Sequence, residues 1–412
     1  MTLSFYGRNA WWLSTGFILT LGSSFGQTYF IALFAGGFRT DFGLSNGEWG
    51  GIYTIATIGS AILLAQVGRL ADTVPLGRLA VGIVLAYALS ACLMMMATGP
   101  VMLLVAVFGL RFCGQGMMSH ISMTAMARWF RANRARAVAV AVLGFPVGEA
   151  LLPLLAVPVI EAFGWRVSWG FVSAALLLVF LPLVLLLMSQ GRTPQGEGGG
   201  ESAVGMGGRH WTRGEVLRSW TFWVLMPGVL APPFIGTAIF FHQVHVSEVR
   251  DYPLATMALA FPVYAGCVVA TSFLAGFVVD RLGPTRILPV ILLPLGVAIA
   301  VLSLPGGVSI WFLVLAGAAL TNGMMVTVGG TLWPTLYGTR WIGGVKALAT
   351  SFLVLSTAIG PGVTGALIDL GITFPQQALA LSAWCLGMCA VFAVVAPRLS
   401  RELPAAPTPQ AA

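Results

Sequence analysis

Two ionisable residues, Arg111 and Glu149, lie deep inside long apolar stretches of the chain. An unpartnered charge at the centre of a bilayer costs about 2.5–3.5 kcal/mol even on insertion scales, so each side chain needs a partner or water. One interpretation is functional: Glu149 takes up a proton, and Arg111 binds an anion or responds to that proton. The other is structural: the two form a permanent ion pair. At about 1.5 Å per helical residue they lie roughly 15 Å and 20 Å from the same end of their helices, so a pair is feasible and both interpretations stay open.

Three histidines also lie in the apolar stretches, where an imidazole can titrate near neutral pH. We expect His120 and His245, near the ends of their stretches, to be hydrogen-bonded or interfacial, and we keep His242 as a candidate for proton coupling. His242 and His245 are three residues apart but have no third ligand nearby, so no zinc site is predicted. No catalytic triad, phosphate-binding loop or metal cluster occurs in the sequence. We therefore expect no enzyme, no metal, no cofactor and no ATP-driven pump.

Polar side chains inside the apolar stretches complete the set of candidate substrate contacts. Most polar groups in membrane helices serve helix–helix contact, so only a few of these are expected to touch a solute. The candidates are Gln27, Tyr29, Tyr53, Gln115, Gln243, Tyr264 and Asn322. Trp49 is interpreted instead as a residue of the membrane-interface belt.

The elements that position these residues must be membrane helices. The chain of 412 residues is 58% hydrophobic and 8% charged, whereas soluble domains carry about 25% charged residues. This excludes a soluble cytosolic enzyme, a disordered chain and a disulfide scaffold. About 20 apolar residues cross a membrane, and we count twelve such runs. They are approximately 10–37, 47–67, 79–98, 101–126, 136–162, 167–189, 220–246, 254–278, 287–304, 308–334, 342–368 and 375–397.

The basic residues orient these spans. Seventeen of them fall in the terminal and loop segments on one side, and only Arg39, Arg166 and Arg250 fall on the other. Cytoplasmic loops are rich in Lys and Arg, so both termini are expected in the cytoplasm. The net charge of +8 is thus a signal of topology, and no nucleic-acid partner is predicted. The stretches 227–233 (PGVLAPP) and 358–362 (AIGPG), which contain proline and glycine, are the expected helix bends.

The chain divides into two halves of six spans. Residues 1–189 form the first half and residues 220–412 the second, which ends in a short cytoplasmic tail. A Gly-rich cytoplasmic linker, 190–219, joins them and is expected to be flexible over 190–215. At a fixed offset of 208 residues, Gly68, Asp72 and Arg78 correspond to Gly276, Asp280 and Arg286. Duplicated halves of this kind are typical of transporters that bind a solute near the midplane.

The two repeated loops resemble a family signature. GRLADTVPLGR (68–78) and GFVVDRLGPTR (276–286) are similar to the loop motif of the major facilitator superfamily. The resemblance implies an all-α fold of twelve transmembrane helices in two pseudo-symmetric six-helix bundles, with these loops as gates. The first copy departs from the motif, because Pro75 stands where a second glycine is usual. The implied gating residues are Gly68, Asp72, Arg78, Gly276, Asp280, Arg281, Gly283 and Arg286.

Further stretches resemble the monocarboxylate and oxalate/formate porter branch. They are RFCGQG (111–116), GFPVGEA (144–150), the tripeptide Gly164-Trp165-Arg166 and FFHQVH (240–245). In the superfamily the seventh span lines the central cavity, which strengthens His242 as a candidate. The Arg that many branch members carry in the eighth span is missing, because residues 263–279 hold no charge.

These observations predict a secondary active transporter of the bacterial inner membrane, functional as a monomer. Its expected cargo is a small organic solute, above all a monocarboxylate, moved with a proton by alternating access. The alternative is a proton-driven exporter of amphipathic or drug-like compounds. A receptor or channel of the same fold is a third class, disfavoured by the intact second gating motif.

Overall fold

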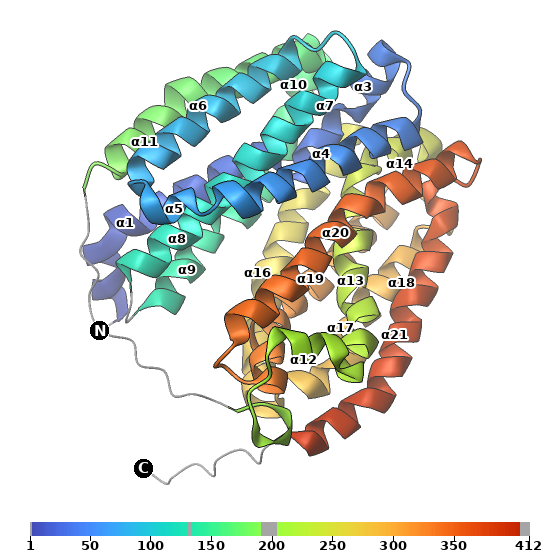
Figure 1. The fold of residues 1–412 in the computed structure, drawn as a ribbon. Coiled ribbons are helices and arrows are strands. Elements are labelled where there is room, and N and C mark those ends of the chain that lie inside the picture. Colours follow the sequence, from blue (N-terminus) through green and yellow to red (C-terminus); the bar gives the residue numbers. More distant parts are fainter. Residues whose placement is uncertain (1, 131–132, 191–203, 404–412) are drawn as a thin grey trace. The chain divides into compact units, whose positions relative to one another are not determined.

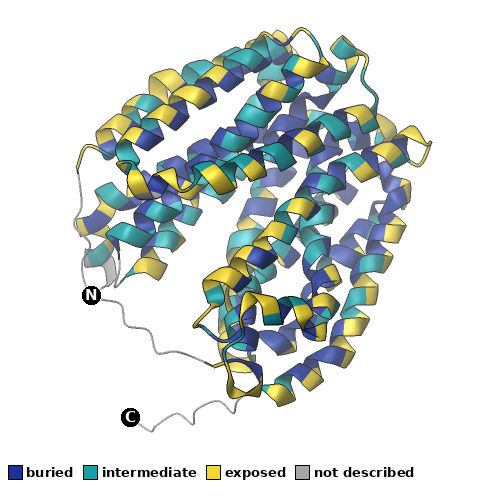
Figure 2. Cartoon of the chain, viewed as in Figure 1, coloured by how far each residue is buried: buried dark blue, intermediate teal, exposed yellow. Residues whose placement is uncertain are grey.

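The computed structural model describes residues 2–130, 133–190 and 204–403, and in these ranges every regular element is a helix (Figure 1). Arg131 and Arg192, which contribute to the predicted orientation, and linker residues 191–203 lie outside the described residues. Large apolar side chains such as Val101, Leu178 and Leu370 are 79%, 75% and 77% exposed. Figure 2 shows such exposed residues in yellow along the outward faces of the helices. Apolar faces of this kind suit a surface that lipid covers.

The first half consists of helices joined by short breaks. Their bounds are α1 Thr2–Gly22, η1 Ser23–Gly26, α2 Thr28–Ile31, η2 Ala32–Phe34, α3 Ala35–Phe42, α4 Asn46–Val67, α5 Leu70–Thr73, α6 Leu76–Met95, α7 Pro100–Leu110, η3 Arg111–Met118, α8 Ser119–Trp129, α9 Arg134–Val142, α10 Gly144–Ala175, η4 Leu176–Phe180 and α11 Leu181–Leu187.

The second half continues in the same manner. Its bounds are η5 Met206–Gly208, α12 Arg213–Arg218, α13 Trp220–Phe241, α14 Gln243–Arg250, α15 Leu254–Ala258, α16 Ala260–Leu282, η6 Pro284–Ile287, α17 Leu288–Ile291, α18 Leu293–Val301, α19 Ser309–Tyr337, α20 Ile342–Asp369 and α21 Phe374–Glu402.

The number of membrane crossings agrees with the prediction. Within the described residues, 10 helices are long and apolar enough to span a membrane, or 11 when the bent pair Phe5–Gly26 and Thr28–Phe42 is one span. One of these, Arg134–Leu187, is 54 residues long, while about 20 residues suffice for a crossing. Gly164 interrupts it with φ 75° and ψ 169°, a conformation that only glycine adopts readily. Counted as two crossings, this segment brings the total to twelve.

The chain forms two compact units that do not coincide with the two halves of the sequence. Unit 1 comprises Met1–Gly199, Thr237–Ala265 and Ala358–Phe374. Unit 2 comprises Gly200–Gly236, Gly266–Thr357 and Pro375–Ala412. Unit 1 thus combines the first six spans with two segments of the second half.

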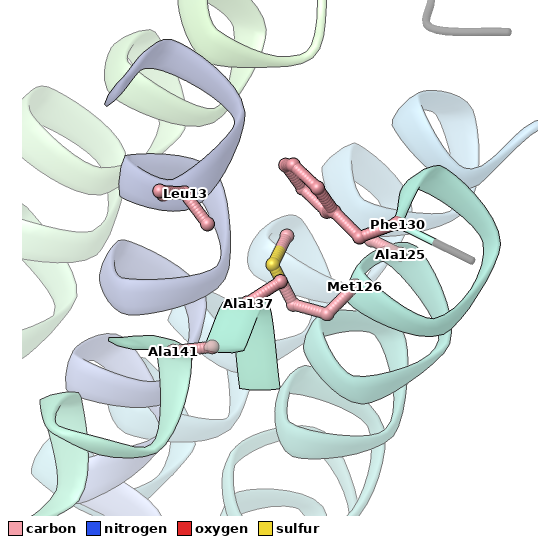
Figure 3. Close-up of a cluster of buried hydrophobic side chains, with 6 residues drawn as sticks. All are labelled: Leu13, Ala125, Met126, Phe130, Ala137 and Ala141. Carbon is pink, nitrogen blue, oxygen red and sulfur yellow. The ribbon is translucent and has the colours of Figure 1, made fainter. Parts of the chain in front are cut away.

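Small residues bring the helices of unit 1 close together. Leu13, Ala125, Met126, Phe130, Ala137 and Ala141 form a buried cluster between α1, α8 and α9 (Figure 3). Gly16 belongs to the same contact, because a Cβ added there would lie 2.7 Å from the Cβ of Ala141. Thr20 then reaches the carbonyl oxygen of Ala141 at 2.5 Å. Close backbone approach and hydroxyl-to-carbonyl bonds are the usual contacts between membrane helices.

The described part of the predicted linker, residues 204–215, makes defined contacts, and its flexibility stays a prediction. The amide of Trp211 donates to the Tyr337 carbonyl at 3.0 Å, and its indole N–H donates to the Met206 carbonyl at 3.1 Å. Thr212 and Glu215 form a capping box at the start of α12. The Gly-rich composition concealed this anchored tryptophan.

The expected proline bends do not interrupt their helices. α13 runs unbroken through Pro227, Pro232 and Pro233, and α20 runs through Pro361. The first span is interrupted, because it breaks at Gln27.

Candidate functional site

The first span is broken in its middle. Gln27 has extended backbone angles, φ −81° and ψ 154°, between η1 and α2, and the two parts of the span meet at 40°. Gly26 makes this break fit, because a Cβ there would lie 2.3 Å from the Leu110 carbonyl oxygen and 3.0 Å from the Cα of Gly114. Opposite the break, the fourth span is wound as a π-helix over Arg111–Met118. Broken membrane helices and π-turns are both frequent at binding sites.

Arg111 lies against this break and is almost fully buried, with 1% of its surface exposed. Its Nη1 donates to the Gly26 carbonyl oxygen at 3.1 Å and to Thr28 Oγ1 at 3.4 Å. Its Cζ lies 5.1 Å from the centre of the Tyr53 ring, and Tyr53 Oη is 2.5 Å from Thr28 Oγ1. The Nε and Nη2 atoms are buried and have no hydrogen-bond partner. One edge of the guanidinium is thus occupied by protein and the other is free.

The ion pair between Arg111 and Glu149 that the sequence allows is not formed. Among the described residues, the ion pairs of unit 1 do not include either side chain. Glu149 is half-buried on α10. The preceding Gly148 packs on the broken span, since a Cβ there would lie 2.0 Å from Ser24 Oγ and 3.1 Å from Tyr29 Oη. Glu149 therefore follows a residue that packs on the broken span.

Tyr29 connects the break to an aromatic cluster. Its side chain is buried, and its hydroxyl has no hydrogen-bond partner. The Tyr29 ring lies 6.3 Å from Phe240 and 6.1 Å from Phe261, centre to centre. Tyr264 contacts the same Phe240 at 5.2 Å. The carbonyl oxygen of Tyr29 accepts a 2.9 Å hydrogen bond from the side-chain Nε2 of Gln243.

The other predicted contacts are distributed unevenly. Gln27 and Gln115 are half-buried, at the break and in the π-helix. Asn322 is half-buried in α19 and belongs to unit 2. Unit 1 thus holds all the predicted solute contacts except Asn322.

His242 serves a packing contact in this structure. It is 2% exposed, and its Nε2 is 2.8 Å from Thr364 Oγ1. Its ring lies 5.1 Å from Phe241 and 5.4 Å from Phe374. His242 thus joins the two segments of the second half that belong to unit 1.

At the end of unit 1 that carries Asp41, called the Asp41 end below, the Gly164-Trp165-Arg166 tripeptide has a clear role. The positive φ of Gly164 turns the chain. The Trp165 indole N–H donates to Asp41 Oδ2 at 3.0 Å, and Arg166 forms an ion pair with the same oxygen. The other Nη of Arg166 donates to the Ala97 carbonyl at 3.2 Å. The tripeptide in α10 therefore connects Asp41, at the end of α3, with Ala97 in the loop after α6.

Segments of the second half close against α3 and α4 at the same end. Arg39 pairs with Glu248 at 3.1 Å. The Asp369 carboxylate accepts from Ser45 Oγ at 2.7 Å and from the Gly47 amide at 2.9 Å. It therefore caps the start of α4, where the helix dipole stabilises an anion.

Glycines let α4 and α20 touch over about two turns beside this cap. A Cβ at Gly50 would lie 2.5 Å from the Pro361 carbonyl oxygen, and one at Gly365 would lie 2.6 Å from the Asn46 carbonyl oxygen. Thr54 Oγ1 donates to the Ala358 carbonyl at 2.7 Å. Trp49 is 1% exposed and stacks on Phe241 at 5.4 Å, so its expected place in the interface belt is wrong.

The gating motifs occupy the ends of their spans. Gly68 ends α4, and its carbonyl oxygen is 3.1 Å from His120 Nε2. Asp72 is in α5 and Arg78 in α6.

The second copy ends α16. Gly276, Asp280 and Arg281 lie in that helix, and Arg286 lies in η6. Gly283 has φ 78°, so the second copy needs its glycine, whereas Pro75 in the first copy has φ −54° and precedes α6. Asp280 is exposed, and no ion pair to it forms among the described residues of unit 2.

Several residues of this site were not predicted. Composition does not distinguish them. Thr28 and Ser45 are uncharged, and Asp369 and the Arg39–Glu248 pair lie near the ends of helices. The Ser45-x-x-Glu48 capping box is the one sequence signal for the start of α4.

Comparisons with known proteins agree with this architecture. The profile of the Major Facilitator Superfamily matches residues 16–361. A protein of Thermoproteus tenax, described as an uncharacterized 38 kDa protein in the 23S RNA operon, is 27% identical over 404 residues, 97% of this chain and 98% of that protein.

Two solved structures share the fold. A bacterial homologue of the human lysosomal transporter Spinster, inward-facing and unoccupied, has a TM-score of 0.69 at 17% identity over 95% of this chain and 96% of its own. The nucleoside transporter NupG has a TM-score of 0.71 at 12% identity, with 93% and 98% covered.

Proposed function

The chain belongs to the Major Facilitator Superfamily, and on that premise we propose that it carries a small carboxylate across the membrane together with a proton. Membership makes it an integral membrane transporter of a small molecule and not an enzyme. The identity of the cargo, the proton and the monomeric state belong to the proposal. The distribution of arginines supports termini in the cytoplasm, so on this proposal the Asp41 end faces outward.

The free edge of Arg111 is the observation that carries the substrate class. An arginine with no acidic partner in a membrane interior is costly unless an anion joins it. Nε and Nη2, the two unpartnered atoms, are the adjacent donors of one guanidinium edge. Two parallel N–H donors match the two oxygens of one carboxylate. The site therefore fits a single carboxylate better than a neutral solute.

Glu149 is the proposed proton carrier. It makes no ion pair among the described residues of its unit, and it adjoins Gly148, which contacts the broken span. A carboxyl in hydrocarbon is far less costly in its neutral form than as an anion. Protonation of Glu149 together with carboxylate binding to Arg111 leaves both side chains neutralised while access to the site changes from one side of the membrane to the other.

Alternating access requires contacts that close the outer end of the transporter in one state and its cytoplasmic end in the other. The contacts of Asp369 and Glu248 are made at the Asp41 end. Asp280, in the second gating motif, is exposed and makes no ion pair in unit 2. We propose that the contacts of Asp369 and Glu248 within unit 1 are among those that form and break during the transport cycle.

A thermal-shift screen tests the substrate class. Purified protein is heated with acetate, pyruvate, lactate, benzoate and oxalate, each beside its neutral amide. A ligand that binds only the folded state at about 100 times its Kd stabilises the protein by about 2.7 kcal/mol. We expect stabilisation by at least one monocarboxylate and none by its amide. Equal shifts from acid and amide would contradict the proposal.

Export of amphipathic compounds is the second candidate, and the aromatic cluster favours it. Tyr29, Phe240, Phe261 and Tyr264 contact one another beside the break. Stacked aromatic faces bind flat apolar or cationic compounds. Stabilisation by hydrophobic cations such as ethidium, without any effect of carboxylates, would select this function instead.

A further inference from the structure

We propose that a groove on unit 2 binds the phosphate headgroup of an anionic phospholipid. The groove has a volume of about 400 Å³ and lies where α12 meets the start of α20. Its lining residues are Thr212, Arg213, Arg340, Trp341, Gly343 and Gly344. All of them belong to unit 2, whereas Arg111 belongs to unit 1. The inference therefore goes beyond the proposed function and does not depend on the identity of the cargo.

Two segments that are far apart in the chain form the groove. The amide of Trp211 donates to the Tyr337 carbonyl at 3.0 Å, which fixes the start of α12 beside the end of α19. A Cβ added at Gly344 would lie 3.9 Å from the Cβ of Arg213, and one added at Gly343 would meet open space. The two glycines therefore leave the groove open beside Arg213.

The two arginines of the groove carry charges that the protein does not neutralise. Arg213 and Arg340 are exposed, and neither forms an ion pair among the described residues. Glu215, two residues from Arg213, is already engaged by Arg209 at 3.1 Å and by the amide and hydroxyl of Thr212, each at 2.7 Å. The groove thus presents two positive charges to an anion.

The lengths of the neighbouring helices place the groove at the level of lipid headgroups. α19 has 29 residues and α20 has 28, which is about 42–44 Å at 1.5 Å per residue. A bilayer is about 40–45 Å thick with its headgroups, and its hydrocarbon core is about 30 Å. The loop between Tyr337 and Ile342, which carries Arg340 and Trp341, therefore leaves the membrane in the polar layer.

Tryptophans mark the same layer. Trp341 is about half exposed, and so are Trp220 and Trp223 at the start of α13. Such rings are enriched at the interface between membrane and water. The guanidinium carbon of Arg340 lies 5.3 Å from the centre of the Trp341 ring. A ring at this depth brings the neighbouring guanidinium to the level of the lipid phosphates.

A lipid phosphate suits the groove better than a free one. The distribution of arginines supports a cytoplasmic position for this end of the chain, and anionic lipids give the cytoplasmic leaflet its negative surface potential. Trp341 also offers an apolar ring to the glycerol and acyl carbons beside the two charges. Inorganic phosphate has no group that uses this ring.

Native mass spectrometry of the full-length protein in detergent tests the groove. The protein is titrated with dioleoyl phosphatidylglycerol, with zwitterionic dioleoyl phosphatidylcholine for comparison and inorganic phosphate as competitor. Arg213→Gln and Arg340→Gln each remove one charge from the groove. Arg398→Gln is the matched control, because it removes one charge from an exposed position of α21 in the same unit. Size exclusion and melting temperature confirm that each variant is folded.

We expect phosphatidylglycerol to bind about five-fold more weakly to each groove variant, as the loss of one interfacial arginine predicts. Binding to Arg398→Gln should match the native protein, and phosphatidylcholine should bind all four proteins weakly. An equal loss in Arg398→Gln would overturn the proposal, because it would show only diffuse attraction to a basic surface. Displacement of the lipid by an equal concentration of inorganic phosphate would assign the groove to free phosphate and would also overturn it.

Hydrogen exchange of the native protein locates the lipid without relying on any variant. Nanodiscs of phosphatidylcholine are compared with nanodiscs that also contain phosphatidylglycerol. A headgroup that joins Arg213 to Arg340 should slow exchange in residues 213–218 and 342–346, and the double variant Arg213→Gln/Arg340→Gln should lose this effect. Protection by phosphatidylglycerol confined to other segments would contradict the proposal.

Discussion

At the scale of single residues, the chemistry depends on one charge that the protein does not neutralise. The sequence identified Arg111 and Glu149 because ionisable groups are rare in apolar stretches. It did not show how they are arranged. Whether two side chains pair depends on which helix faces meet, and here Arg111 turns to Gly26, Thr28 and Tyr53.

Replacing Arg111 separates its charge from its geometry. Arg111→Lys keeps the charge but loses the two-donor edge, and Arg111→Gln loses both. We expect carboxylate affinity to fall about ten-fold or more in Arg111→Lys, as loss of a charge-assisted bond predicts, and further in Arg111→Gln. Equilibrium binding of the best carboxylate from the thermal-shift screen measures this. If Arg111→Lys bound the carboxylate as tightly as the native protein does, the geometry of the guanidinium edge would be irrelevant.

Replacing Glu149 tests whether proton coupling can be lost while transport of the solute remains. Glu149→Gln resembles the protonated carboxyl and cannot titrate, so it should exchange carboxylate across proteoliposome membranes but lose accumulation driven by a pH gradient. Counterflow and gradient-driven uptake are measured on the same preparation. Retained accumulation would assign the proton to another group.

At the scale of elements, the spans were predictable and their interruptions were not. Long apolar runs give membrane helices directly. The break at Gln27 falls in a run of small and polar residues, GSSFGQT (22–28), that the count of apolar residues passed over, while α13 and α20 continue through their prolines. The break depends on the close fit of Gly26 to Gly114, which is a tertiary contact. The same reason explains why the Asp369 cap on α4 was missed.

Two adjacent glycines of α4 test the contact with α20. Gly50→Ala places a methyl group 2.5 Å from a backbone oxygen of Pro361, whereas the Cβ of Gly51→Ala has open space. Overpacking costs about 1–3 kcal/mol, so Gly50→Ala should lower the melting temperature and Gly51→Ala should not. Equal melting temperatures in the two variants would show that this contact is absent in the membrane.

The anchored linker predicts a pH effect outside the membrane. Bonds from the backbone and side chain of Thr212, together with Arg209, lower the pKa of Glu215 below its ordinary 4.5. A lowered pKa in the folded state stabilises α12 above pH 4.5, and this contribution is lost as the pH falls through the lowered pKa.

Hydrogen exchange of residues 213–218 measures this effect, with Glu215→Gln as the control. Protection should fall with acid in the native chain more steeply than in the variant. Parallel pH profiles for the two proteins would exclude the capping box as the source.

At the scale of the whole molecule, duplication and charge distribution were sufficient to predict the superfamily fold, which the family match confirms. They were not sufficient to predict the two compact units, because the segments Thr237–Ala265 and Ala358–Phe374 associate with the first half. That association joins segments far apart in the chain, which span counts and charge distribution do not register.

Uptake of labelled carboxylate into proteoliposomes, with and without an inward proton gradient, tests the central claim most directly. The probe is the carboxylate that gives the largest thermal shift, and liposomes containing Arg111→Gln provide the background. We predict accumulation above the outside concentration only with the gradient and only with the native protein. Uptake that ignores the gradient, or that equals the Arg111→Gln background, would contradict the account.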